Sequence, residues 1–298
     1  MTALEFYRIT TETLEELAKR HCVRDLEKYY SLTDFLAFPQ LKDLGEIEQT
    51  YMQIAFHGQN ATLISNIIRF EKNYPLLEDI LCGFSPAKVI NKYCAQASSP
   101  AEAEDRLLHA FTEKGISSDL HKSTVRPNTI LAGYVSMLLD AAAYLKEFRL
   151  KQEVIADLMR NYPNGEAKAL VTYFRSRIRS RFSVALTCDF LKEYSEVFDL
   201  PKPDIHIKDT LCAVKGLEKN YYRTEKREYE CIRHMQELVD EINLALAAEK
   251  GKKISVYQLD RMIWLICSDN FFLDDTTTNS KEDYLKKIKC PLNMCAVL

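Results

Sequence analysis

The sequence predicts an all-α protein, and three observations favour that class. Apolar residues recur at the spacing of one helix face along most of the chain, as between Ile232 and Leu246. No stretch of useful length alternates apolar and polar residues, which is the pattern of a half-buried strand. The 298 residues include only 8 glycines and 9 prolines, a composition that argues against a disordered, fibrous or barrel-like protein.

Breaker residues and capping signals place the helices along the chain. Ser99-Pro100-Ala101-Glu102 and Ser255-Val256-Tyr257-Gln258 are capping boxes, each of which predicts a helix start. Pro75 and Pro86 stand at first-turn positions that proline tolerates, and Gly251 ends a long helix. In order, helices are expected over 2–20, near 24–36 and 43–56, through 63–70, after Pro75 and Pro86, from Pro100, over 128–149, up to Pro163, over 166–180, from Val184, after Asp204, over 222–249, from Val256 and near the C-terminus.

Charge and cysteine content narrow the functional classes. A net charge of −3 gives no overall attraction to nucleic acid or acidic membranes, so a polyanion must be bound by a local patch. The 9 cysteines form no Cys-x-x-Cys pair and no zinc or iron–sulfur spacing, so no metal is expected. Their odd number, with no secretory leader, favours reduced thiols in an intracellular protein, cytoplasmic in a prokaryote or nuclear in a eukaryote. No apolar run is long enough to span a membrane.

The stretch Leu200–Asp209 contains the first candidate for chemistry. Two prolines stiffen an approach loop, and Asp204 then precedes an apolar-periodic segment that includes Ile207 and Leu211. This pattern is typical of a helix start, and it places the carboxylate at the positive end of the helix dipole. Asp204 is therefore either a helix cap or a positioned catalytic carboxylate.

A second candidate is the densest basic cluster of the chain, formed by Arg175, Arg177, Arg179 and Arg181. Four charges two residues apart spread around a helix, so about half of them can face one partner. The alternative is a solvated face whose arginines pair with distant acids. A short link, Phe182-Ser183, follows the cluster and leads into an apolar helix.

The order of basic helix, short link, apolar helix, proline loop and aspartate resembles the helix-hairpin-helix DNA glycosylase superfamily. In that family a hairpin between two helices grips a DNA phosphate through backbone N–H groups. An aspartate about twenty residues later, often followed at the second position by histidine, begins another helix and serves the chemistry. Lys202–Ile207 looks like this segment, and Ser180–Ala185 aligns with the hairpin. The resemblance is best over 165–215 and extends more loosely to 256–265.

The resemblance implies two helical lobes around a cleft, one of about 57–149 and the other of about 150–298 plus 1–56. It implies a DNA glycosylase of base excision repair, which flips a damaged or modified base out of double-stranded DNA and releases it. A monomer without a cofactor is expected. Asp204 would stabilise the positive sugar and orient water. Ala185 stands where lyase-type members carry their catalytic lysine, so base release without strand cleavage is expected.

Two alternatives to this interpretation stay open. The aligned hairpin has no glycine, although the family usually has Gly-x-Gly there, so arginine side chains would have to replace its grip on phosphate. A rival alignment uses Tyr162–Lys168 and makes Lys168 the Schiff-base lysine of a bifunctional glycosylase and lyase. In the other alternative the chain is a non-catalytic helical module that binds nucleic acid or a protein.

Further site residues follow from the same interpretation. Contacts to DNA are expected from basic and polar side chains near the link and near the aspartate: Arg175, Arg177, Arg179, Arg181, Ser183, Lys202, His206 and Lys208. A base pocket is expected from Gln59, Asn60, Tyr134 and Trp264. Three of these have a structural alternative: Asn60 is equally a helix cap, Trp264 a core residue, and Tyr134 is open in the same way. His206 can likewise be a structural histidine.

Overall fold

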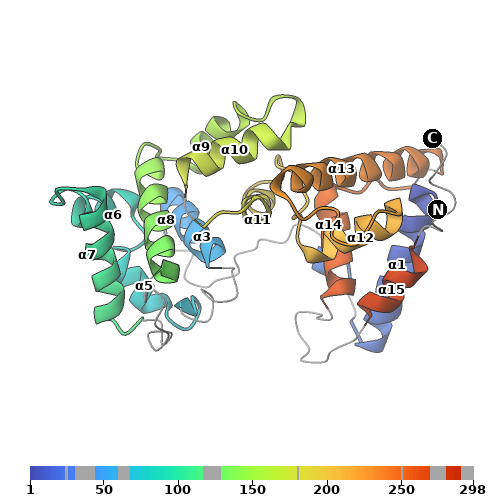
Figure 1. Cartoon of the computed structure of the whole chain (residues 1–298), viewed down its shortest axis with the longest axis horizontal. Coiled ribbons are helices and arrows are strands. Elements are labelled where there is room, and N and C mark those ends of the chain that lie inside the picture. Colours follow the sequence, from blue (N-terminus) through green and yellow to red (C-terminus); the bar gives the residue numbers. More distant parts are fainter. Residues whose placement is uncertain are drawn as a thin grey trace. The chain divides into compact units, whose positions relative to one another are not determined.

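The computed structural model of the chain describes residues 1–23, 26–30, 44–59, 68–116, 129–179, 181–249, 251–268 and 280–289. Within these residues every regular element is a helix and no strand occurs (Figure 1). The all-α class predicted from the sequence is therefore confirmed. Of the described helices, none combines the length and the apolar character that crossing a membrane requires.

The chain divides into two compact units. The central unit consists of Leu36–Phe190, and the terminal unit joins Met1–Phe35 to Leu191–Leu298. The boundary at Phe190 falls inside a single helix, α11 (Val184–Tyr194). These bounds are not those of the lobes expected from the sequence, 57–149 and 150–298 with 1–56, and a cleft between lobes stays a prediction.

The central unit is built around α8 (Thr129–Leu145). Its other described elements are α3 (Glu46–Gly58), α5 (Tyr74–Ile80), α6 (Pro86–Tyr93), α7 (Pro100–Glu113), α9 (Lys151–Met159), the 3₁₀ turn η3 (Pro163–Gly165), α10 (Ala167–Arg177) and most of α11. Helix α8 packs against α3, α6, α7 and α10. Its small residues Ala141 and Ala142 are fully buried in these contacts. The Tyr51 hydroxyl donates to the carbonyl of Leu138 at 3.0 Å, which ties α3 to α8.

The terminal unit is built around α14 (Val256–Cys267). It also contains α1 (Ala3–Arg20), α2 (Glu27–Tyr30), α12 (Ile205–Lys215), α13 (Glu225–Ala248) and α15 (Lys281–Lys287), and α14 contacts all five. The apolar stripe expected between Ile232 and Leu246 is buried, as are Phe6 of α1 and Leu211 of α12. The two ends of the chain therefore share one hydrophobic core.

The capping signals hold with one correction. Ser255 and Gln258 form the expected reciprocal box at the start of α14. At α7, Ser99 accepts from the backbone N–H of Glu102, but the Glu102 carboxylate bonds Ser98 instead of Ser99. The start is still at Pro100, because one bonded cap and proline in the first turn suffice to begin a helix.

Two helices are shorter than the sequence predicts. Helix α8 ends at Leu145 instead of near 149, because the Glu153 carboxylate accepts the backbone N–H groups of Arg149 and Leu150 and starts α9 there. Helix α10 ends at Arg177 instead of near 180, since Ile178 is buried in a non-helical conformation with φ −121° and ψ 84°. In both cases a contact formed after the helix outcompetes further helical turns.

Candidate functional site

Helices α10 and α11 are joined by a short link between Arg177 and Val184, which is longer than the Phe182-Ser183 link predicted from the sequence because α10 ends early. Arg175 Nε donates to the carbonyl of Phe182 at 3.0 Å and closes the link. Ser183 Oγ accepts the N–H of Leu186 at 3.2 Å, so Ser183 caps α11 from an exposed position. Arg181 has φ 69°, in the left-handed region that usually favours glycine. This arginine supplies the turn for which the sequence has no glycine.

The four arginines of the cluster have different surroundings. The Arg175 guanidinium bonds the link itself, and Arg181 is half-buried, its Cδ lying 3.0 Å from where a Cβ on Gly133 would be. Burial lowers the pKa of the Arg181 guanidinium. Arg177 and Arg179 are exposed and line the same cavity. Two of the four side chains therefore stabilise the central unit, and two face outward.

In the terminal unit Asp204 caps α12. Its Oδ1 accepts the backbone N–H groups of His206 at 2.8 Å and Ile207 at 3.1 Å. Its Oδ2 accepts no hydrogen bond from the part of the chain that the structure describes, and the side chain is partly exposed. The capping role is present, and one carboxylate oxygen remains available for chemistry.

A buried ion pair, which the sequence interpretation missed, is connected to Asp204 through the backbone of Lys202. Asp260 of α14 is only 2% exposed and its Oδ2 lies 3.1 Å from Lys192 Nζ. The same oxygen accepts the backbone N–H of Lys202, whose carbonyl in turn accepts the N–H of Asp204 at 2.7 Å. Burial raises the pKa of Asp260, the Lys192 ammonium opposes that rise, and the charge of Asp204 adds to it. Asp260 thus anchors the loop that presents Asp204.

A signal for this pair is present in the sequence. Lys192 follows the apolar residues of α11, and Asp260 stands beside Leu259 on the apolar face of α14. A charge on an apolar face requires a buried partner. Which partner it finds depends on how α11 and α14 pack. Lys192 lines a cavity of about 440 Å³ together with Tyr257, whereas neither Asp260 nor Asp204 is among the residues that line it.

The other residues expected to contact DNA differ in their exposure and their partners. Lys208 Nζ lies 2.5 Å from Glu228, and both side chains are largely buried. Lys202 is held through its backbone, and His206 is half-buried in the first turn of α12. Lys168, the alternative lyase nucleophile, is exposed in the first turn of α10. Lys168 and the arginines belong to the central unit, and Asp204 with Lys202, His206 and Lys208 to the terminal unit.

The described side chains that were expected to form a base pocket make hydrogen bonds or packing contacts within the protein. Gln59 is buried, and its Oε1 accepts the N–H of Phe70 at 3.2 Å. Tyr134 is fully buried and its hydroxyl donates to the carbonyl of Ala55 at 2.8 Å. Trp264 packs against the core of the terminal unit, with the Arg261 guanidinium 5.4 Å from its ring centroid. Asn60 lies outside the described residues. A base pocket formed by these side chains stays a prediction.

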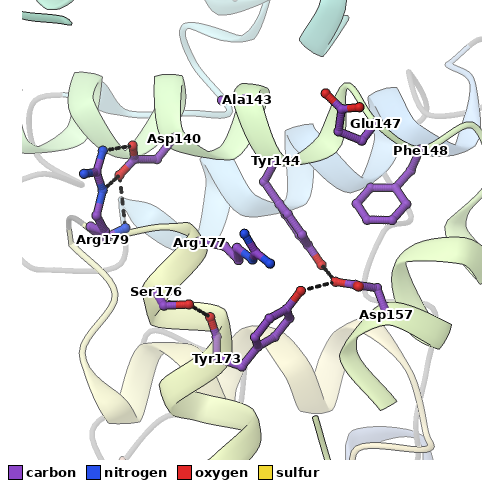
Figure 2. Close-up of a pocket in the computed structure, with 10 residues that line it drawn as sticks. All are labelled: Asp140, Ala143, Tyr144, Glu147, Phe148, Asp157, Tyr173, Ser176, Arg177 and Arg179. Atoms are coloured by element: carbon purple, nitrogen blue, oxygen red, sulfur yellow. Dashed lines mark hydrogen bonds and ion pairs between the residues drawn. The ribbon is translucent and has the colours of Figure 1, made fainter. Parts of the chain in front are cut away.

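The sequence interpretation also missed a cluster of rings beside the two outward arginines (Figure 2). Tyr144, Phe148, Asp157 and Tyr173 line the same cavity, of about 420 Å³, as Arg177 and Arg179. Spacing by four residues could have indicated it, because Tyr144 precedes Phe148 and Tyr173 precedes Arg177 by one helical turn. The meeting of the two helices could not be read from that spacing.

Neither a metal centre nor a known relative adds to these observations. Among the residues that the structure describes, no three histidine, cysteine, aspartate or glutamate side chains are grouped so that they could hold a metal ion. Comparisons with protein families, with curated proteins and with solved structures find no match to this chain.

Proposed function

We propose that the chain is a monofunctional DNA glycosylase, which hydrolyses the N-glycosidic bond of a damaged or modified base in double-stranded DNA. The observation that carries the proposal is the Asp204 carboxylate. Two backbone N–H groups orient it through one oxygen, and its second oxygen accepts no hydrogen bond from the described residues. Lys202 links this segment to the buried Asp260, so the carboxylate is presented from a braced loop.

The reaction needs a fixed negative charge beside the sugar. As the bond between C1′ and the base breaks, its electron pair leaves with the base and positive charge develops on the sugar ring. A preorganised carboxylate stabilises that charge and accepts a proton from the water whose oxygen bonds to C1′. The departing base takes up a proton. Ala185 supplies no amine for a Schiff base, so the product is an abasic site in an uncut strand.

DNA binding is supported by the link and its arginines. Arg177 and Arg179 are exposed, and Ser183 is exposed at the start of α11, where backbone N–H groups favour an anion. Arg181 supplies the left-handed residue of the turn in place of glycine. Lys202, His206 and Lys208 are proposed to contact DNA from the terminal unit.

The deciding experiment measures base release from duplexes that carry alkylated, oxidised, deaminated or bulky modified bases. The intact protein is expected to release one of these classes, and Asp204→Asn to slow the release by roughly 100-fold or more. Asparagine caps a helix about as well as aspartate, so this variant keeps its melting temperature. Asp240→Asn removes one charge from the exposed face of α13 and serves as the matched control, with unchanged activity.

Three results would contradict the proposal in different ways. Full activity of Asp204→Asn would remove the carboxylate from the chemistry. Duplex binding without release of any base would favour a non-catalytic module. Borohydride trapping of a covalent DNA adduct that disappears in Lys168→Ala would make the enzyme a bifunctional glycosylase and lyase.

A further inference from the structure

A cavity of about 420 Å³ lies among α8, α9 and α10 of the central unit (Figure 2). Its walls include the rings of Tyr144, Phe148 and Tyr173. Arg177 and Arg179 also line it. The function proposed above uses these arginines only as general phosphate contacts. The rings, and the carboxylate that holds two of them, have no role in it.

Two of the three rings are held in place by one carboxylate. Asp157 Oδ2 accepts hydrogen bonds from Tyr144 at 2.8 Å and from Tyr173 at 2.7 Å, and the two tyrosines point toward it from α8 and α10 (Figure 2). The third ring, Phe148, meets Tyr144 edge to face with the centroids 5.2 Å apart. The ring faces are therefore positioned before a ligand arrives, which lowers the entropy lost on binding.

Both guanidiniums keep N–H groups for a ligand. Arg179 Nε and one Nη bond Asp140 at 3.3 and 2.8 Å, yet its side chain is 76% exposed. A guanidinium has five N–H donors, so donors remain after this pairing. Arg177 is exposed and its guanidinium lies 4.9 Å from the centroid of the Tyr173 ring. A side-chain hydrogen bond with Tyr173 raises the pKa of Arg177, and the pairing with Asp140 raises the pKa of Arg179. Both guanidiniums therefore stay cationic.

The charges of the lining narrow the choice of ligand. Asp140, Glu147 and Asp157 accompany the two arginines, so a bare inorganic anion meets no net positive field. A ligand that also covers the rings gains stacking and loses water from apolar surface. The chemistry that combines a planar apolar face with a phosphate is a nucleotide.

We propose that this cavity binds one unstacked nucleotide of a single DNA strand, its base against the rings of Tyr144, Phe148 and Tyr173 and its phosphate on Arg177 and Arg179. Aromatic side chains bind bases without sequence preference, and guanidiniums bind phosphate through paired hydrogen bonds. Binding at this site does not require base release, so it stands or fails separately from the proposed enzymatic activity.

The test is fluorescence anisotropy of a labelled oligothymidylate titrated with the full chain. Arg177→Gln and Arg179→Gln are each expected to weaken binding roughly tenfold or more. Phe148→Leu, which keeps an apolar side chain but removes the ring, is expected to weaken it roughly 5- to 100-fold. Arg8→Gln is the matched control: Arg8 is exposed and paired with Glu249, much as Arg179 is with Asp140, and belongs to the terminal unit. The Arg8→Gln variant is expected to bind the oligomer within about twofold of the affinity of the intact protein, because an exposed charge outside the site has a small effect.

Competition and a catalytic variant complete the design. Thymidine monophosphate is expected to displace the oligomer and inorganic phosphate is not. If the monophosphate binds in a direct titration while the oligomer does not, the site takes a free nucleotide and the proposed binding of a strand is wrong. Equal competition by inorganic phosphate, an equal loss in Arg8→Gln, or no loss in Phe148→Leu would overturn the proposal. Asp204→Asn is expected to keep the affinity, which separates this site from base release.

Discussion

At the scale of single residues, two carboxylates near the start of α12 differ in what surrounds them. Asp204 is partly exposed and has one oxygen available, whereas Asp260 is buried and bonded to the Lys192 ammonium and the Lys202 backbone N–H. An exposed carboxylate can take part in chemistry. A buried one must keep its partners, because an unpaired buried charge is strongly destabilising.

Lys192→Met tests the dependence of Asp260 on its partner. The substitution keeps a long apolar side chain but leaves the Asp260 carboxylate without its cation, so a loss of about 3–5 kcal/mol in the free energy of unfolding is expected. The double variant Lys192→Met with Asp260→Asn carries no buried charge, and the Asn amide oxygen can still accept from Lys202. It is expected to be more stable than the single variant.

Urea unfolding of the two single variants and the double variant measures this coupling. Strictly additive losses would mean that Lys192 and Asp260 do not stabilise one another. In that case the proposed bracing of Asp204 through Asp260 would lose its support.

At the scale of elements, Asp157 joins three consecutive helices of the central unit. From α9 it accepts hydrogen bonds from Tyr144 on α8 and Tyr173 on α10, and it pairs with Arg160. Burial by itself raises the pKa of Asp157. The two tyrosine hydroxyls and Arg160 outweigh that effect, and the net pKa lies below the usual 3.8.

This lowered pKa gives a pH dependence of defined sign. The unfolded chain binds the proton more tightly than the folded one, so the carboxylate stabilises the fold above pH 3.8, and that stabilisation is lost as the pH falls through the lowered pKa. Asp157→Asn is expected to lose about 1–3 kcal/mol at neutral pH and to unfold with a weaker dependence on acid. Asp105→Asn, on the exposed face of α7, is the control.

Thermal unfolding between pH 2.5 and 7 measures this difference. If the acid branch of Asp157→Asn coincides with that of the intact protein after a constant offset, the three hydrogen bonds do not favour the charged carboxylate. The rings of the proposed nucleotide site would then not be held by Asp157.

At the scale of the molecule, the two units have separate cores. Phe6 is fully buried among α1, α13 and α14, which come from the two ends of the chain. Phe111 is fully buried in the central unit, where its ring meets that of Tyr134 edge to face with the ring centroids 6.1 Å apart. Each unit therefore buries its own aromatic anchor.

Two matched truncations test this organisation. Phe6→Ala and Phe111→Ala are each expected to cost about 3–5 kcal/mol through loss of apolar contact and the cavity left behind. Hydrogen exchange should rise in α13 and α14 for Phe6→Ala and in α7 and α8 for Phe111→Ala. A uniform rise across both units in either variant would contradict separate cores.

The sequence by itself determined the helical class and many helix starts. The caps at Ser255 and Asp204 follow from residues within one turn of each start, as does the amphipathic stripe of α13. The short link after the arginine-rich helix was evident for the same reason. Helix formation depends on neighbours a few residues apart, and the sequence displays them directly.

Only the tertiary structure decided which polar side chains have partners. Lys192 and Asp260 are 68 residues apart, and Arg179 and Asp140 are 39 apart. The Tyr134 hydroxyl and the Gln59 Oε1, both expected at a base pocket, bond backbone atoms in the interior of the central unit. Of the four arginines, packing turned two inward and left two beside a cluster of rings. The reason is physical: a side chain's partner is set by which helix faces meet, and local periodicity shows that a face is apolar without showing what covers it.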